Sequence, residues 1–421
     1  MVDASFFKSS DRIRIAPTLR PHSNAVCLRA PGSKSHSTRA LVLRHLTGDE
    51  TDLRGCSSST DARVLSAGLR GLRRSAASID AADGGAPGRF LMAVAAATGV
   101  SCSLDGSARL RERPFAPLIE AVRSLGATVS CQGKDGHLPL DINGRLTENF
   151  VRVDSRTSSQ FASALLLVGP VLPCGLEVAA LEPVSDGYLD LTVEVMRAFG
   201  ADIEEESLEA GRLFQVGSGF DPPSTYDVPA DVSGAAFLWL AGVVGPTPIS
   251  VALAREGSHP DLSFLDCLEA MGADVVSRDG VTTVGGDLHR GGTFDLSSFP
   301  DSACALGIAA AVNPEPVTIT GASHLRLKES DRIQSMVDGL TALGLEVTAS
   351  DDGFHVAGGK DLAQGCLIPS HDDHRVAMAF ATLGARHTIM VDGVECVDKS
   401  FPEFFETLSV ITEITQNEDA P

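Results

Sequence analysis

Apolar and polar positions recur along this chain with a period of about 70 residues, which indicates a repeated structural unit. An amphipathic segment, a glycine and a short β-branched run follow one another in four copies, whose glycines are Gly126, Gly200, Gly272 and Gly344. Each copy predicts an exposed helix, a left-handed glycine just past its C-terminus, and then a strand. The segment around Gly71 is a candidate for a degenerate earlier copy.

A second series of helices alternates with the first. Six segments are apolar nearly all the way round, which predicts buried helices. These helices are expected to begin near Ser35, Pro87, Ser158, Asp231, Asp301 and Asp373. With short strands between them, the pattern predicts six α/β units, three in each of two domains, with a break near residues 220–224.

Nearly every buried helix is expected to begin with polar residues. Ordinary N-capping explains aspartates such as Asp231. Capping does not explain Lys34, Gln160 or Arg375, because a cation at a helix N-terminus opposes the helix dipole. An anionic ligand is a better explanation, and six helix N-termini that converge on one cleft would attract anions strongly.

Residues 326–332 place three cations and two carboxylates just before an amphipathic segment. If that helix begins near Ser330, Lys328 and Arg332 share one helical face, while Glu329 points elsewhere and could carry a proton. Taken alone, the stretch is explained equally well as a solvated, charged helix start.

Composition narrows the classes of partner. The formal net charge of −21 argues against nucleic acid or an anionic membrane, so a local basic cluster must attract any anionic substrate. Nine cysteines without a CxxC pair, and the absence of a signal peptide, indicate reduced thiols in the cytoplasm. No apolar run reaches the roughly 18 residues that are needed to span a bilayer.

Eight motifs, in order, resemble those of the 5-enolpyruvylshikimate-3-phosphate synthases, a branch of the enolpyruvyl transferase family. They occupy residues 31–41, 110–114, 158–160, 184–188, 299–301, 325–332, 372–375 and 399–402. Each motif is weak evidence by itself, whereas the ordered set between about residues 25 and 410 is specific.

The resemblance implies an α/β fold of two similar globular domains, each with three βαβαββ units around buried parallel helices. One domain is expected at residues 20–228, on the shikimate 3-phosphate side. The second combines residues 1–19 with 229–421, on the phosphoenolpyruvate side. The active site is expected in the cleft between them.

The same resemblance implies the reaction. The enolpyruvyl group of phosphoenolpyruvate passes to the 5-hydroxyl of shikimate 3-phosphate by addition and elimination, with release of phosphate. This transferase step belongs to the shikimate pathway of chorismate and aromatic amino acid biosynthesis, and it needs no metal or organic cofactor. The expected partners are these two small molecules, without nucleic acid or membrane, and the protein is expected to be a cytoplasmic monomer.

Both substrates carry a phosphate and a carboxylate, so several Arg and Lys side chains are required. By resemblance, the phosphoenolpyruvate site comprises Lys34, Gly85, Arg113, Gln160, Arg332, Arg375 and Lys399. The shikimate 3-phosphate site comprises Lys34, Ser35, Arg39, Ser158, Ser159, Gln160, Ser185, Asp301, His324 and Lys328, with Tyr188 as a neighbour.

Protons move twice in this reaction, so a base near the hydroxyl and an acid near the methylene are required. Asp301 is expected to be the base, and the alternative is that it simply caps a helix after Pro300. Glu329 and Lys399 compete for the methylene proton, and Lys34 is expected to stabilise charge on both substrates.

The chain departs from the family pattern in three places. Asp83 replaces an amide in the loop at residues 83–89, which could weaken phosphoenolpyruvate binding. His324 stands where many members have Asn. Asp61 stands where an acidic pair is usual, and we expect this change to affect only a helix cap.

Two other functions are considered. One is the related transferase that acts on a UDP-amino sugar, but its usual loop cysteine is missing beside Arg113. The other is a non-catalytic anion-binding paralogue, against which the retained proton carriers argue, since binding alone needs none.

Overall fold

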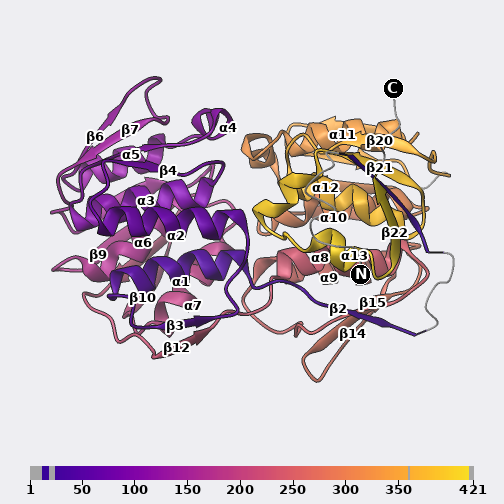
Figure 1. Cartoon of the computed structure of the whole chain (residues 1–421), viewed down its shortest axis with the longest axis horizontal. Helices are drawn as coiled ribbons and strands as arrows, with labels where there is room; N and C mark the ends of the chain where they lie inside the picture. Colours follow the sequence, from indigo (N-terminus) through magenta and orange to yellow (C-terminus); the bar gives the residue numbers. More distant parts are fainter. Residues whose placement is uncertain (1–11, 19–23, 359–360, 417–421) are drawn as a thin grey trace. The chain divides into compact units, whose positions relative to one another are not determined.

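The computed structural model describes residues 12–18, 24–358 and 361–416. Contacts divide the chain into two compact units (Figure 1). Unit 2 is Gly32–Pro229, and unit 1 combines the described residues up to Pro31 with those from Ala230 onward. The chain passes between the units at Pro31–Gly32 and again at Pro229–Ala230, and residue 20, where the first crossing was expected, lies outside the described residues.

Strand pairing explains where the units divide. The strand β2 (Val26–Leu28) pairs in parallel with β13 (Ile249–Val251), so the chain stays with unit 1 up to Pro31. The strand β12 (Thr225–Asp227) pairs with β3 (Asp52–Arg54), which keeps the segment after residues 220–224 in unit 2.

The described residues form six sheets, three in each unit. The further strands of unit 1 are β1 (Arg12–Pro17), β14 (Asp274–Arg278), β15 (Val281–Gly285), β16 (Gly292–Asp295), β17 (Val317–Thr320), β18 (Val347–Ser350), β19 (Gly353–Val356), β20 (Cys366–Pro369), β21 (Ile389–Asp392) and β22 (Thr412–Gln416). Those of unit 2 are β4 (Ser78–Asp80), β5 (Cys102–Asp105), β6 (Thr128–Cys131), β7 (Leu140–Asn143), β8 (Phe150–Asp154), β9 (Leu176–Leu181), β10 (Ile203–Leu208) and β11 (Gly211–Val216).

Five of these sheets share one topology, a parallel pair extended by two antiparallel pairs. Their orders are β2-β13-β15-β14, β16-β17-β19-β18 and β20-β21-β1-β22 in unit 1, and β4-β5-β7-β6 and β8-β9-β11-β10 in unit 2. The sixth sheet, β3-β12, keeps only the parallel pair. The period seen in the sequence is therefore a repeated sheet unit, and the predicted α/β class is confirmed.

The six predicted buried helices are present. They are α1 (Lys34–Leu46), α3 (Gly85–Thr98) and α6 (Gln160–Val168) in unit 2, and α8 (Val232–Val244), α10 (Ala303–Val312) and α12 (His374–Thr382) in unit 1. Their side chains belong to the hydrophobic core of their own unit. Trp239, on α8, illustrates this burial, since its ring is fully enclosed and its indole N–H donates to the carbonyl of Thr282.

The second helix series is also confirmed. It comprises α2 (Thr60–Arg73), α5 (Ala116–Ser124), α7 (Gly187–Ala198), α9 (Ser263–Met271) and α11 (Arg332–Ala342). Gly126, Gly200, Gly272 and Gly344 have φ angles of 106°, 74°, 110° and 88°, as a left-handed helix end requires. The copy around Gly71 is degenerate because this glycine lies inside α2, and Ser75 takes the left-handed position with a φ of 53°.

No helix in the described part of the chain is long and apolar enough to cross a membrane. All nine cysteines are free thiols.

Candidate active site

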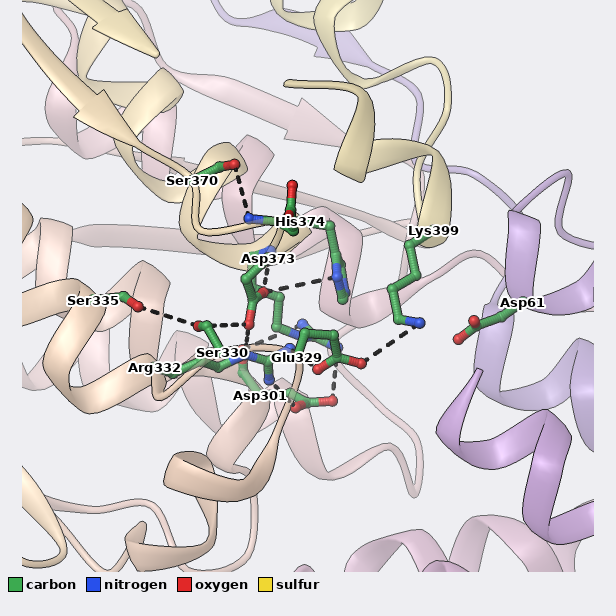
Figure 2. A network of polar contacts seen from close by, with 12 residues as sticks. Asp61, Asp301, Glu329, Ser330, Arg332, Ser335, Ser370, Asp373, His374 and Lys399 are labelled. Carbon is green, nitrogen blue, oxygen red and sulfur yellow. Dashed lines mark hydrogen bonds and ion pairs between the residues drawn. The ribbon is translucent and has the colours of Figure 1, made fainter. Parts of the chain in front are cut away.

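A network of charges in unit 1 surrounds Arg332, the first residue of α11 (Figure 2). This side chain is only 2% exposed, and its guanidinium donates to Asp373 at 2.7 Å, to Glu329 at 2.8 Å and to Asp301 at 3.1 Å. Burial opposes the charge of Arg332, but the neighbouring carboxylates outweigh burial and hold its pKa well above the usual value. The guanidinium therefore stays charged in the core.

Asp301 connects the two candidate arginines. Its carboxylate accepts from Arg332 and, at 2.7 Å, from Nη2 of Arg375, whose Nη1 also donates to the backbone carbonyl of Asp301 at 3.2 Å. Asp301 lies in the short 3₁₀ helix Pro300–Ser302, and the residue that precedes α10 as N-cap is Ser302. The alternative that Asp301 simply caps this helix is therefore wrong.

Glu329 and Lys399, the two candidates for the methylene proton, lie side by side. Nζ of Lys399 is 3.7 Å from Oε1 of Glu329, while the other carboxylate oxygen of Glu329 accepts from Arg332. The prediction that Glu329 points away from this cluster is wrong, because Arg332 holds it there. Both candidates remain open, since the two groups form one ion pair.

The helix after residues 326–332 begins later than predicted. Asp331 is the N-cap of α11, and its carboxylate accepts from the backbone N–H of Gln334 at 3.0 Å. Lys328 precedes the cap with an extended backbone, so it does not share a helical face with Arg332 as predicted. The capping aspartate decides the first helical residue here.

His324 is a buried histidine in the 3₁₀ helix Ser323–Leu327 of unit 1. Burial, reinforced by the positive charge of Lys328, lowers the pKa of His324 to about 3. The imidazole is therefore neutral near pH 7, and it can act there as a hydrogen-bonding group without adding charge.

Asp261 is a buried carboxyl of unit 1 whose charge interacts with Asp301 and Arg375, and no motif in the sequence singled it out. It sits in the 3₁₀ helix Pro260–Leu262, is 0% exposed, and accepts a hydrogen bond from the hydroxyl of Ser233 on α8. Burial, and then the negative charge of Asp301, raise the pKa of Asp261 to about 7, although the positive charge of Arg375 opposes this. Asp261 lies two residues before α9, and nothing in the neighbouring sequence indicated that its side chain would be buried.

In unit 2, Lys34 begins α1 and forms an ion pair with Asp61, with 3.1 Å between Nζ and Oδ2. Asp61 is buried in the first turn of α2, where the capping residue is Ser59. The expectation that Asp61 affects only a helix cap is therefore wrong, because its carboxylate contacts one of the expected catalytic cations.

Arg39 is a second buried cation of unit 2. Its guanidinium donates to the hydroxyl of Thr192 at 2.7 Å and to the backbone carbonyls of Ser35 at 3.0 Å and Tyr188 at 3.2 Å. Burial lowers the pKa of Arg39 to about 10, so it stays protonated near pH 7. These contacts place the guanidinium of Arg39 against the backbone of Ser35, one turn earlier on α1, and of Tyr188.

The predicted serines lie near the start of α6 and before α7. Ser158 and Ser159 are buried just before α6, and Ser158 Oγ accepts from the backbone N–H of Gln160 at 3.3 Å. Ser185 is also buried, and its φ of 54° is unusual for a residue with a side chain.

The loop before α3 places a glycine against a guanidinium. A Cβ atom added to Gly85 would lie 2.7 Å from Nη1 of Arg113, so any larger residue here would have to move the guanidinium. The unusual Asp83 accepts a hydrogen bond from Ser107, the N-cap of the short helix α4 (Ala108–Glu112) that precedes Arg113. Asp83 therefore ties the loop to the segment that carries Arg113.

Among the described residues, no group of His, Cys, Asp and Glu side chains is placed to hold a metal ion. Alongside their carboxylates, the clusters in both units present guanidinium, ammonium, hydroxyl and amide groups, which suit phosphate and carboxylate ligands.

Comparisons with known proteins give one family. A family model described as EPSP synthase (3-phosphoshikimate 1-carboxyvinyltransferase) matches residues 74–408. A protein named 3-phosphoshikimate 1-carboxyvinyltransferase from Thermococcus kodakarensis is 37% identical over 403 residues, covering 92% of this chain and 97% of that protein. One with the same name from Methanoculleus marisnigri is 35% identical over 410 residues, covering 90% of this chain and 95% of that protein.

Solved structures agree with this result. An EPSP synthase from Acinetobacter baumannii superposes with a TM-score of 0.75 at 26% identity, covering 96% of this chain and 100% of that one. The enolpyruvyl transferase NikO from Streptomyces tendae shares the fold, with a TM-score of 0.71 at 18% identity, covering 98% of this chain and 100% of that one. The resemblance and the fold predicted from the motifs are confirmed.

The raised pKa of Asp261 predicts how stability depends on pH. The folded protein holds this proton up to about pH 7, whereas an exposed aspartate loses it near pH ~3.9, so the folded state loses stability as pH rises from about 4 to about 7. Asp261→Asn keeps the size of the side chain and cannot ionise. Between pH 5 and pH 8 the variant should gain stability relative to the parent, on the order of 1–3 kcal/mol.

Melting curves at both pH values measure this difference. Asp279→Asn is the matched control, since this side chain is 90% exposed in the same unit and should leave the pH dependence unchanged. Parallel pH profiles for Asp261→Asn and the parent would show that the buried carboxyl does not hold a proton.

Proposed function

The chain belongs to the EPSP synthase (3-phosphoshikimate 1-carboxyvinyltransferase) family, and we propose that it transfers the enolpyruvyl group of phosphoenolpyruvate to the 5-hydroxyl of shikimate 3-phosphate. The reaction is an addition followed by an elimination that releases phosphate, within the shikimate pathway to aromatic amino acids. The observation that carries the proposal is the cluster in which Arg332 and Arg375 share Asp301 beside the Glu329–Lys399 pair.

We propose that unit 1 binds phosphoenolpyruvate through Arg332, Arg375 and Lys399. Two guanidiniums suit the phosphate and carboxylate of this substrate, since each can donate two parallel hydrogen bonds. Both guanidiniums are already oriented by Asp301, so little side-chain freedom remains to be lost when an anion binds. Arg113, Gln160, Lys34 and the backbone at Gly85 are the proposed contributors from unit 2.

Shikimate 3-phosphate is assigned mainly to unit 2. The hydroxyls of Ser158, Ser159 and Ser185 and the amide of Gln160 are proposed to hold its phosphate. The region of Ser35 and Arg39 is proposed to bind its carboxylate and ring. From unit 1, Lys328 and the neutral His324 are proposed to add hydrogen bonds to the same substrate.

The proton transfers are assigned to three groups of unit 1. Asp301 is the proposed base at the 5-hydroxyl, since a carboxylate fixed by two arginines is positioned to accept a proton. The Glu329–Lys399 ion pair is proposed to exchange the methylene proton. Lys34, held by Asp61, is proposed to stabilise the negative charge that develops on the substrates.

Nothing in the comparisons favours a UDP-amino-sugar transferase or a non-catalytic paralogue. We also propose that the protein acts as a cytoplasmic monomer, for which its free thiols and acidic charge are the supporting features.

The direct test is phosphate release by the purified protein from phosphoenolpyruvate and shikimate 3-phosphate. We expect turnover with this pair and none when a UDP-amino sugar replaces shikimate 3-phosphate. A protein that binds both substrates without releasing phosphate would support the non-catalytic alternative.

Asp301→Asn tests the base. The change keeps the shape of the side chain but removes its basicity, so turnover should fall about 100- to 10,000-fold. The affinity for shikimate 3-phosphate should change much less, because its phosphate is assigned to serines. Asp338→Asn, on the exposed side of α11, is the control and should keep full turnover. A folded Asp301→Asn variant within about threefold of the parent would reject Asp301 as base, since such a loss is below the range for a general base.

Gly85→Ala tests the assignment of Arg113. The new methyl group would displace the guanidinium, because Nη1 of Arg113 lies 2.7 Å from the place that the added Cβ would occupy. The KM for phosphoenolpyruvate should therefore rise about tenfold, whereas the KM for shikimate 3-phosphate should change less. Gly133→Ala is the matched control, because nothing lies within 4 Å of its added Cβ. Equal changes in both KM values would contradict a role specific to phosphoenolpyruvate.

A further inference from the structure

Arg89 is a buried cation of unit 2 to which the proposed mechanism assigns no role. It lies on α3 and is 2% exposed. Its guanidinium carbon stacks 4.8 Å from the ring centre of Phe161 and 5.3 Å from that of Phe115. Contact with two aromatic rings, together with hydrogen bonds from both terminal nitrogens, restricts the orientation of the guanidinium.

Those N–H groups point at residues of the proposed binding site. Nη1 donates to Oε1 of Gln160 at 2.6 Å and to Oγ of Ser158 at 3.4 Å. Nη2 donates to the backbone carbonyl of Pro114 at 3.0 Å, one residue after Arg113. One rigid side chain therefore contacts the start of α6 and the segment that carries Arg113.

The bond to Gln160 decides which end of its amide can contact a ligand. A free glutamine amide can turn either its carbonyl oxygen or its NH₂ group toward a neighbour. Arg89 can only donate, so the carbonyl oxygen must face Arg89. The NH₂ group is left as the end that can contact a ligand, and it is a donor.

The hydroxyl of Ser158 is constrained in the same way. Its oxygen accepts from Nη1 of Arg89 at 3.4 Å and from the backbone N–H of Gln160 at 3.3 Å. A hydroxyl has two acceptor lone pairs and one proton, so these contacts leave its O–H to donate outward.

We propose that Arg89 is a positioning residue that occupies the acceptor atoms of Gln160 and Ser158, so that both side chains present hydrogen-bond donors to an anion. This inference rests on the proposed function, in which Gln160 and Ser158 hold the phosphate of shikimate 3-phosphate. It adds a role for a residue that does not itself touch the substrate, and it explains why an uncharged amide and hydroxyl select an anion.

A double-mutant cycle between Arg89 and Gln160 tests the proposal. Arg89→Lys keeps the charge but cannot reproduce the planar, several-donor contact, so the Kd for shikimate 3-phosphate should rise about tenfold. Gln160→Met should cause a similar loss. The double variant should bind no more than about twofold worse than Gln160→Met alone, because Arg89 acts largely through Gln160.

Calorimetric Kd values and melting temperatures are measured for each variant and for Arg145→Lys. Arg145 is the matched control, since its guanidinium donates to backbone carbonyls at the other end of α3. A purely structural Arg89 would lower the melting temperature while its effect on the Kd added fully to that of Gln160→Met. Full additivity would therefore overturn the proposal.

Gln160→Glu gives a test that leaves Arg89 in place, should Arg89→Lys fail to fold. Its carboxylate should form a charge-assisted bond to Arg89, so the variant should melt at or above the parent temperature. It has no NH₂ donor, so its Kd should rise at least about tenfold. A variant that melts below the parent, or binds as tightly as the parent, would overturn the proposed amide orientation.

The turnover of the parent separates this inference from the function on which it rests. If the parent releases no phosphate from the two substrates, the proposed function fails. If the parent is active and the cycle is additive, only the role of Arg89 fails.

Discussion

The compensation of buried positive charge is the constraint on which the candidate site depends. Arg332 and Arg375 lie in the first turns of α11 and α12, where the helix dipole disfavours a cation. A buried charge is tolerated only when it is paired and hydrogen-bonded, and carboxylates from several segments supply this pairing. Removing one of them would leave an uncompensated charge in the core, so the network should act as a unit.

The two units satisfy their buried cations differently. The guanidiniums of unit 1 donate to carboxylates, which fixes them and moderates their charge. In unit 2, Arg39 and Arg89 donate to hydroxyl, amide and carbonyl oxygens. Neutral acceptors leave more of the positive potential in place, which favours an anionic ligand despite the net charge of −21.

The repeated sheet unit explains how these groups reach the ends of helices. Each complete sheet joins one parallel pair to two antiparallel pairs, and a parallel pair requires a crossover. In four of the five sheets a buried helix makes this crossover, whereas unit 2 and α8 lie between β2 and β13. Each repeat therefore supplies a buried helix with a polar start. Such starts carry Lys34, Gln160 and Arg375, while Arg332 begins a helix of the second series.

Local patterns in the sequence were sufficient to predict the repeat, the two helix series, the left-handed glycines and the order of the motifs, because each depends on residues a few positions apart. Only the tertiary structure decided which charged and polar side chains contact one another. Asp301 contacts Arg375 across 74 positions, Arg89 contacts Gln160 across 71, and Asp61 lies against Lys34 from a different helix. A helix cap was the expectation for Asp61 and the alternative to a base for Asp301, because a cap is the local use of an aspartate. Folding brought cations to these carboxylates, and leaving a buried cation such as Arg332 unpaired would cost more free energy than losing a helix cap.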